Sequence, residues 1–339
     1  MKIQIRERLR PFTHQYGTLI PLPRSFYSVQ LFPTHLIFHD LRKGGGDPVH
    51  ELALDITGPI HEWSATLDLE SASIQVSGHA QEGFFRFHLF GNRESVLFDD
   101  GDERHLILGS HFEPSKNPPL PRISFGCHKK ADWQQVVKRN CIQEVLPFWA
   151  KLGRMMPEVP LGQGGTLDLL EELSTLSEKL PEERLPLLEK CWRLAFHGLL
   201  TPTTRDLFHQ GERLSHVEAD VSPLPLLTEG ARLIEKLLYS VEGLGIELLP
   251  ALPSPLYCGR VTGIEEVKGA KIDFEWTKKV LRRVAIDCSE KIEIALTLPK
   301  RVKRFRLRSH KCDRGQWKSS GEPLTLEKDG RYLLDNFER

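Results

Sequence analysis

The hydrophobic pattern of this 339-residue chain changes its period twice, and this change limits the folds that the chain can adopt. In residues 26–90, apolar and polar residues alternate at every second position, which is typical of strands that are buried on one face. Glycine-containing turn signals separate these segments, as in an antiparallel β-sandwich. The alternating segments are FYSVQLF (26–32), HLIFHDL (35–41), ATLDLE (65–70), SIQVSGHA (73–80) and FFRFHLF (84–90).

From about residue 130 to residue 243 the apolar residues recur with a helical period. We expect Pro147 to kink or divide the first helix and Pro181 to end the second. After Pro255 the alternation returns in KIDFEW, VLRRVAIDC, KIEIALTL and RFRLRSH, which predicts a second set of strands. The predicted helices cover residues 131–153, 165–180, 181–200, 203–211 and 226–243.

These patterns predict an α+β protein with three parts. Residues 1–125 form an N-terminal antiparallel β-sandwich, and residues 126–250 form a reduced α-helical domain of the α/α-barrel-like kind. Residues 251–339 form a C-terminal β-sandwich. The strand-averse connector SKNPPLP (115–121) is the predicted boundary between the first two parts. The length of the chain is sufficient for two or three domains.

The composition excludes several classes of partner. Lys plus Arg and Asp plus Glu both number 46, so no net charge attracts the chain to nucleic acid or to an anionic membrane. No apolar run approaches the roughly 18 residues of a spanning helix, and the N-terminus lacks a signal-peptide core. The six cysteines are scattered without metal-ligand spacing. We expect a cytoplasmic protein without a metal ion or cofactor.

Two groups of charged residues are candidates for chemistry. Glu229, Glu235, Glu242 and Glu247 lie near the predicted junction of helices and strands, and paired carboxylates are what glycoside hydrolysis requires. Solvated helix charges are the alternative interpretation, because Glu229 and Arg232 have the spacing of a surface pair. The glycine after Glu229 would let a ligand approach the backbone. The sequence contains no P-loop, dinucleotide-binding fingerprint, HExxH or GxSxG motif.

The second group is basic. Residues 277–318 hold 14 Lys or Arg against 4 Asp or Glu, and alternation places Arg304, Arg306 and Arg308 on one face of a strand. Such a face is typical of a module that binds phosphate or nucleic acid. An ordinary solvated sheet face would show the same pattern. In FFRFHLF, Phe85 and Phe87 are interpreted as sandwich core, with stacking on sugar rings as the alternative.

One stretch resembles a known family. IELLPALPSPLYCGRVTGIEEVKGAKIDFEW (246–276) is similar to the end of the helical barrel and the following β domain of family-95 glycoside hydrolases, the α-L-fucosidase-type enzymes. The shared features are the LLPALP run, three glycines and an acidic-x-x-Trp strand ending at Trp276. EKLLYS (235–240) resembles the last barrel helix of that family. The resemblance implies a glycosidase-like scaffold and a carbohydrate ligand.

The chain departs from the family pattern where the family has its catalytic aspartate. The family's Asp-Gly-Asn-Phe-Gly motif lies one helix before LLPALP, and aligning EKLLYS places Leu224 near that aspartate. We therefore expect a catalytically degenerate, glycoside-hydrolase-like protein that binds carbohydrate or another partner. The alternative is an active glycosidase with relocated carboxylates. For that case Glu229 is the candidate catalytic residue, and Arg232 and Trp276 are the candidate substrate-binding residues.

Overall fold

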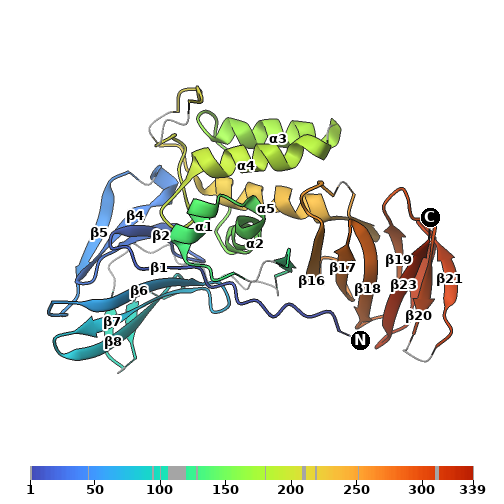
Figure 1. Cartoon of the computed structure of the whole chain (residues 1–339), viewed down its shortest axis with the longest axis horizontal. Coiled ribbons are helices and arrows are strands. Elements are labelled where there is room, and N and C mark those ends of the chain that lie inside the picture. Colours follow the sequence, from blue (N-terminus) through green and yellow to red (C-terminus); the bar gives the residue numbers. More distant parts are fainter. Residues whose placement is uncertain are drawn as a thin grey trace.

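The fold consists of a helical layer between two β parts (Figure 1). A computed structural model describes most of the chain. Of the SKNPPLP connector (115–121), the described residues are 120 and 121. Within the described residues, no helix combines the length and the apolar character needed to cross a membrane. The described residues are 2–44, 46–93, 95–99, 101–105, 120–126, 129–179, 181–207, 211–217, 220–250, 252–309 and 313–338.

The N-terminal part is the predicted sandwich of two antiparallel sheets. Its strands coincide with the alternating segments because each buries one face, and both sheets contribute side chains to one core cluster, Phe38 and Phe87 among them. The first sheet contains β1 (Phe12–Thr13), β6 (His61–Asp68), β7 (Ser73–Ala80), β8 (Gly83–Phe90), β9 (Ser95–Phe98) and β10 (Glu103–His105), and the second contains β2 (Thr18–Pro21), β3 (Tyr27–Leu31), β4 (His35–Asp40) and β5 (Pro48–Ala53). A short 3-10 turn, η1 (Leu41–Lys43), follows β4.

The helical part differs from prediction in several places. The last predicted helix, 226–243, ends at Leu238 and residues 239–242 form a strand instead, and the helix predicted to reach residue 200 ends at Ala195. The first predicted helix is divided at Asn140, whose left-handed φ of 46° ends one helix, whereas Pro147 lies inside the next. The segment predicted as a helix at 203–211 is not helical at 203–207, and residues 208–210 lie outside the described residues. The helices are α1 (Trp133–Arg139), α2 (Ile142–Gly153), α3 (Leu167–Lys179), η2 (Pro181–Glu183), α4 (Arg184–Ala195) and α5 (Leu224–Leu238), with a small hairpin of β12 (Phe196–His197) and β13 (Thr201–Pro202) after α4.

Helices α2 and α5 pack closely through two glycines. A Cβ atom at Gly153 would collide with the carbonyl oxygen of Leu227, and one at Gly230 would collide with the indole ring of Trp149. The Trp149 Nε1 group donates to the Leu226 carbonyl at 2.9 Å. The backbone space that the sequence suggested for a ligand beside Glu229 is therefore filled by a tryptophan of the core.

The C-terminal part follows directly from α5, because the chain turns into strand β14 (Tyr239–Glu242) at the end of the helix. The two sheets share a core that includes Phe274 and Trp276. One sheet has the order β11 (Arg122–Ser124), β16 (Cys258–Ile264), β17 (Ala270–Thr277), β18 (Val280–Cys288), β23 (Arg331–Glu338), β20 (Arg304–Arg308) and β21 (Gln316–Ser319), and the other has β14, β15 (Gly245–Leu248), β19 (Ile292–Thr297) and β22 (Pro323–Leu326).

Two segments join the N-terminal third of the sequence to the C-terminal part. Strand β11 pairs with β16, although residue 124 lies within the predicted N-terminal domain. The N-terminal strap, defined as residues 2–10, runs beneath the helices from the C-terminal sheet to the N-terminal sandwich (Figure 1). At one end of the strap Arg260 donates to the carbonyl of Gln4 at 3.0 Å, and at the other Leu69 donates to the carbonyl of Leu9 at 3.0 Å.

Candidate functional site

Charged side chains from all three parts gather where these parts meet. We call this group the central charged cluster and define it as Glu70, Arg122, Lys151, Arg154, Glu235 and Glu266. Lys151 lies in the last turn of α2, and Arg154 is the residue that caps the C-terminal end of this helix. The acids come from the turn after β6, from α5 and from the loop after β16. The cluster thus depends on the packing of elements that are distant in the sequence.

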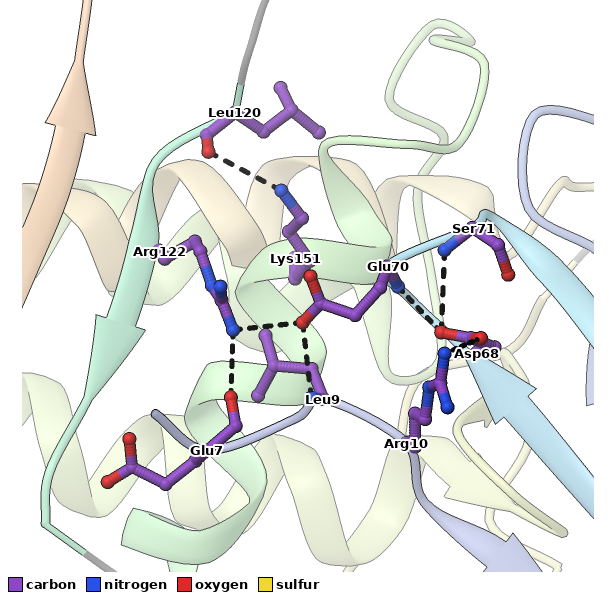
Figure 2. Close-up of polar contacts among 9 residues, drawn as sticks. All are labelled: Glu7, Leu9, Arg10, Asp68, Glu70, Ser71, Leu120, Arg122 and Lys151. Carbon is purple, nitrogen blue, oxygen red and sulfur yellow. Dashed lines mark hydrogen bonds and ion pairs between the residues drawn. The ribbon is translucent and has the colours of Figure 1, made fainter. Parts of the chain in front are cut away.

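The first half of the cluster holds the N-terminal strap in place (Figure 2). Arg122 on β11 pairs with Glu70 at 2.9 Å and donates to the carbonyl of Glu7 at 2.8 Å. The same Glu70 carboxylate accepts a hydrogen bond from the backbone N–H of Leu9 at 3.3 Å. Arg122 and Glu70 therefore clamp two points of the strap between the sandwich and the C-terminal sheet.

Beside this clamp, Arg10 pairs with the buried Asp68 at 2.8 Å. Burial of the Asp68 carboxyl opposes ionisation, but hydrogen bonds from Glu70 and Ser71 and the Arg10 guanidinium outweigh it and hold its pKa below the usual range. Asp68 is therefore an anion at neutral pH.

Lys151 occupies the centre of the cluster. Its ammonium group donates to the Leu120 carbonyl at 3.4 Å (Figure 2). Burial lowers the pKa of Lys151; the Glu70 carboxylate opposes this shift and the Arg122 guanidinium adds to it. Glu235 also acts on Lys151, so the two halves of the cluster are electrostatically connected.

The second half of the cluster contains two carboxylates that share one arginine. The Nε atom of Arg154 lies 3.6 Å from Glu235, and its Nη2 atom lies 3.5 Å from Glu266. The Tyr239 hydroxyl donates to Glu266 at 3.4 Å, and burial raises the pKa of this phenol. Both carboxylates therefore face the same guanidinium.

Glu235 has the perturbed acidity of the pair. Burial raises the pKa of its carboxyl to about 7; the Arg154 guanidinium opposes the shift and the Glu266 carboxylate adds to it. A carboxyl group with such a pKa can donate a proton at neutral pH. Arg154, however, contacts both acids, so a sugar ring cannot stand between them while these contacts persist.

The structure places two of the residues predicted from the sequence beside this cluster. Glu229 and Arg232 form an ion pair on α5, and Arg232 also pairs with Glu158 at 2.5 Å. About a third of each of the Glu229 and Arg232 side chains is exposed. Arg232 acts electrostatically on Glu235, so the structure connects it to the charged cluster. The catalytic role of Glu229 and the substrate-binding role of Arg232 stay predictions.

Trp276 lies elsewhere, in the core of the C-terminal part. Its side chain is 1% exposed, and its Nε1 group donates to the Leu256 carbonyl at 2.9 Å. The ring lies edge-on to Phe125 at 6.1 Å and fills the space above Gly259. A substrate-binding role for Trp276 stays a prediction, and it would require the ring to be uncovered first.

Sequence reasoning missed most of the central charged cluster. Glu235 carried a visible signal, because it falls on the apolar stripe of α5 together with Leu227, Ala231 and Leu238, where an acid is unexpected. Lys151 carried a weaker one, since it follows Trp149 and Ala150 in a mostly apolar helix. Glu70 and Glu266 carried none, because only the tertiary fold brings them to α2.

Comparison with known protein families finds a match in the C-terminal part. Residues 241–333 match the C-terminal domain of glycoside hydrolase family 95. The match begins in β14, ends in β23 and confirms the family resemblance for just over a quarter of the chain. Strand β11, which pairs with β16 of the matched segment, lies outside the matched residues.

Other comparisons are weaker. A similar solved structure is that of a GH127 β-L-arabinofuranosidase from Geobacillus stearothermophilus T6, with 13% identity and a TM-score of 0.22. The similarity covers 50% of this chain and 31% of that enzyme, and a score this low carries no argument about the present fold. No curated protein matches the chain.

In the C-terminal part, acids of β23 neutralise the basic strand that the sequence singled out. Arg306 pairs with Asp335 of β23 at 2.8 Å, and Arg308 contacts the same carboxylate. Arg304 pairs with Glu338 at 2.6 Å and lies 4.8 Å from the ring centroid of Trp317. These pairs account for the arginine face by contacts inside the sheet.

The aromatic residues of FFRFHLF divide between the core and the surface. Phe87 is fully buried and Phe85 is partly buried against the same core, as the core interpretation of FFRFHLF predicted, whereas Phe84 is exposed with Arg86 over its ring. Among the residues that the structure describes, no group of three or more His, Cys, Asp or Glu side chains is arranged to hold a metal ion.

Proposed function

We propose that the protein is a catalytically degenerate, glycoside-hydrolase-like protein that binds carbohydrate. The observation that carries the proposal is the shared contact of Arg154 with Glu235 and Glu266. A glycosidase needs its two carboxyl groups on either side of the scissile bond, roughly 5–9.5 Å apart. Here one guanidinium links the two acids, which suits a structural ion pair better than a reacting pair.

The position of Leu224 supports the same proposal. The family resemblance places a catalytic aspartate near this residue, and Leu224 is instead a fully buried side chain in the first turn of α5. An aspartate at this position would lie in an apolar core, where burial would raise its pKa and favour the neutral acid. The family-95 domain supports descent from a glycosidase-like scaffold.

The acidity of Glu235 favours a second candidate function. A carboxyl with a pKa of about 7 is suited to be a general acid, and Glu266 is a second carboxylate near it. In this alternative the protein is an active glycosidase with relocated acids. Arg154 would then have to leave the carboxylates when a substrate binds.

A hydrolysis panel and a glycan array, run with the same protein, separate the two functions. The proposal expects binding on the array and no release of chromophore from any chromogenic glycoside. Hydrolysis that is abolished by Glu235→Gln or by Glu229→Gln, but not by the control Arg213→Gln, would establish the active alternative. Absence of both binding and hydrolysis would overturn the carbohydrate proposal.

A cytoplasmic location is a further part of the proposal. The four described cysteines, Cys141, Cys191, Cys258 and Cys288, are free thiols, which suits a reducing compartment. Fractionation of cells that produce the protein would test this location.

A further inference from the structure

A cavity of about 510 Å³ lies between the N-terminal strap and the helices α1 and α2. Strap residues 6–10 form one wall, residues 123–125 of β11 and its end form a second, and α2 closes the cavity. None of its described lining residues belongs to the central charged cluster. Ligand sites are common where domains meet, and this volume suits a small ligand.

The charged side chains at this cavity are mostly basic. Five of the described lining residues are Lys or Arg, and two are Glu. The chain as a whole has equal numbers of basic and acidic residues, so the excess of positive charge is local. One of the five, Arg10, is already paired with Asp68 at 2.8 Å.

Both acids of the lining are held by groups other than the strap arginines. Glu144 is buried and pairs with Arg139 at 2.6 Å and with Lys129 at 3.3 Å. Burial opposes ionisation of its carboxyl, but these two cations outweigh burial and hold its pKa below the usual range. The Glu7 carboxylate accepts a hydrogen bond from the Ser124 hydroxyl at 2.9 Å.

Three cations at the cavity remain without a protein partner. Within the described part of the chain, the guanidinium groups of Arg6 and Arg8 and the ammonium group of Lys130 form no hydrogen bond or ion pair, and all three side chains are exposed. Burial alternates along the strap, where Ile3 and Leu9 are buried and the even-numbered residues from 2 to 8 are exposed. The two arginines therefore project on the same side, and an arginine side chain is always charged in proteins.

The backbone that carries these arginines is fixed at two points. Arg260 donates to the Gln4 carbonyl at 3.0 Å, and Arg122 donates to the Glu7 carbonyl at 2.8 Å (Figure 2). A ligand that binds groups on a fixed backbone loses less free energy to ordering than one that binds a mobile segment. The strap thus presents a preorganised pair of guanidinium groups.

Apolar surface lies between these charges, contributed by Ile123, Phe125 and Pro147 among others. An acidic saccharide matches this combination, because its C–H groups can cover apolar surface and its carboxylates accept paired hydrogen bonds from guanidinium groups. A nucleic acid matches it less well, since bases stack on exposed aromatic rings. The Phe125 and Phe148 side chains at this cavity are only 7% and 8% exposed.

We propose that this cavity binds an acidic saccharide, whose uronate carboxylates pair with Arg6, Arg8 and Lys130. The inference rests on the proposed carbohydrate-binding function and adds the class of carbohydrate and its place. A second cavity of about 400 Å³ shares Arg6 and Glu7 with the first and is also lined by the exposed Lys2. A ligand of more than one sugar ring can therefore continue along the strap toward the C-terminal sheet.

Isothermal titration calorimetry of the whole chain at low salt tests the site. The probes are the trisaccharides of galacturonate and of mannuronate, with their methyl esters as neutral counterparts. We expect at least one acidic trisaccharide to bind, its ester to bind about tenfold more weakly or not at all, and added salt to weaken the binding of the acid. Arg6→Gln, Arg8→Gln and Lys130→Gln should each weaken it about two- to fivefold, as expected for one exposed ion pair.

Lys138→Gln is the matched control, because Lys138 is exposed on α1 but does not line this cavity. Equal binding of acid and ester, or binding that none of the three cavity variants weakens more than the control does, overturns this site and leaves the proposed function standing. Tetraglutamate that binds as tightly as the trisaccharides overturns the saccharide assignment in favour of an acidic peptide. No binding of any trisaccharide also overturns the site, and a negative glycan array would then overturn the proposed function separately.

Discussion

The Nε atom of Arg154 lies 3.6 Å from the carboxylate of Glu235, an α5 residue that is only 7% exposed. Burial raises the Glu235 pKa to about 7 from its ordinary 4.5 despite this contact. The folded protein therefore binds more protons than the unfolded chain between these two pH values. The contribution of Glu235 to the free energy of unfolding is greatest below pH 4.5 and is lost as the pH rises to about 7.

Glu235→Gln should remove this pH dependence, because an amide does not ionise. From pH 5 to pH 8 we expect the free energy of unfolding of the wild type to fall by about 2.5 kcal/mol more than that of the variant. Urea unfolding at a series of pH values measures the difference. Glu229→Gln, on the exposed side of the same helix, is the control and should keep the wild-type slope. Equal slopes in all three proteins would show that Glu235 is not the titrating group.

Arg154→Met should leave two carboxylates facing each other without a cation. We expect a loss of about 1–2 kcal/mol at pH 8, because Glu235, with a pKa of about 7, takes up a proton once the guanidinium is gone, and this limits the cost of the missing partner. The loss should be smaller at pH 5, where Glu235 is protonated. Arg232→Met breaks a partly exposed pair on α5 and should have an effect of at most about 1 kcal/mol. A loss at pH 5 as large as that at pH 8 would contradict the electrostatic explanation.

Gly230→Ala tests the close approach of α2 and α5. The added methyl group would overlap the Trp149 ring, so the helices would have to separate. We expect thermal unfolding to show destabilisation by about 1–3 kcal/mol. Gly46→Ala is the matched control, because no atom lies within 4 Å of the position of its added methyl group. A stable Gly230→Ala protein would mean that the interface can rearrange around this tryptophan.

Arg122→Met should loosen the N-terminal strap. The variant loses the hydrogen bond to the Glu7 carbonyl and the ion pair that orients Glu70 toward Leu9. We expect faster amide hydrogen exchange in residues 4–10, with little change in the sandwich core. In Arg260→Met, which loses the bond to Gln4, the faster exchange should be confined to the first residues of the strap. Unchanged protection at Leu9 would refute the clamp.

Local sequence patterns predicted the elements whose own residues determine them. β3 and β7 alternate clearly, and α5 has an apolar stripe that only Glu235 interrupts. Both Pro147 and Asn140 could end a helix, Pro147 because it lacks an N–H group and Asn140 because it can adopt the left-handed conformation. The sequence favoured Pro147, whereas the structure ends the first helix at Asn140. The pairing of β11 with β16 was also missed, since more than 130 positions separate these strands and no local pattern encodes their contact.

The candidate site was less predictable than the fold for the same reason. Glu235 could be recognised as an acid on an apolar stripe, but its partner Arg154 belongs to another helix and Glu266 to another domain. Glu229 and Arg232 were paired correctly because the i, i+3 spacing is local. Contacts within one helix follow from spacing, and contacts between parts follow only from the assembled fold.

The strap also sets an order of events during protein synthesis. Gln4 leaves the ribosome 256 positions before Arg260, the residue that binds its carbonyl. At about 5–20 residues per second, this interval lasts roughly 13–50 s. During this interval the sandwich can form, whereas the strap cannot yet contact Arg260, which has not been synthesised. The strap residues are therefore synthesised well before they can make their contacts with the C-terminal part.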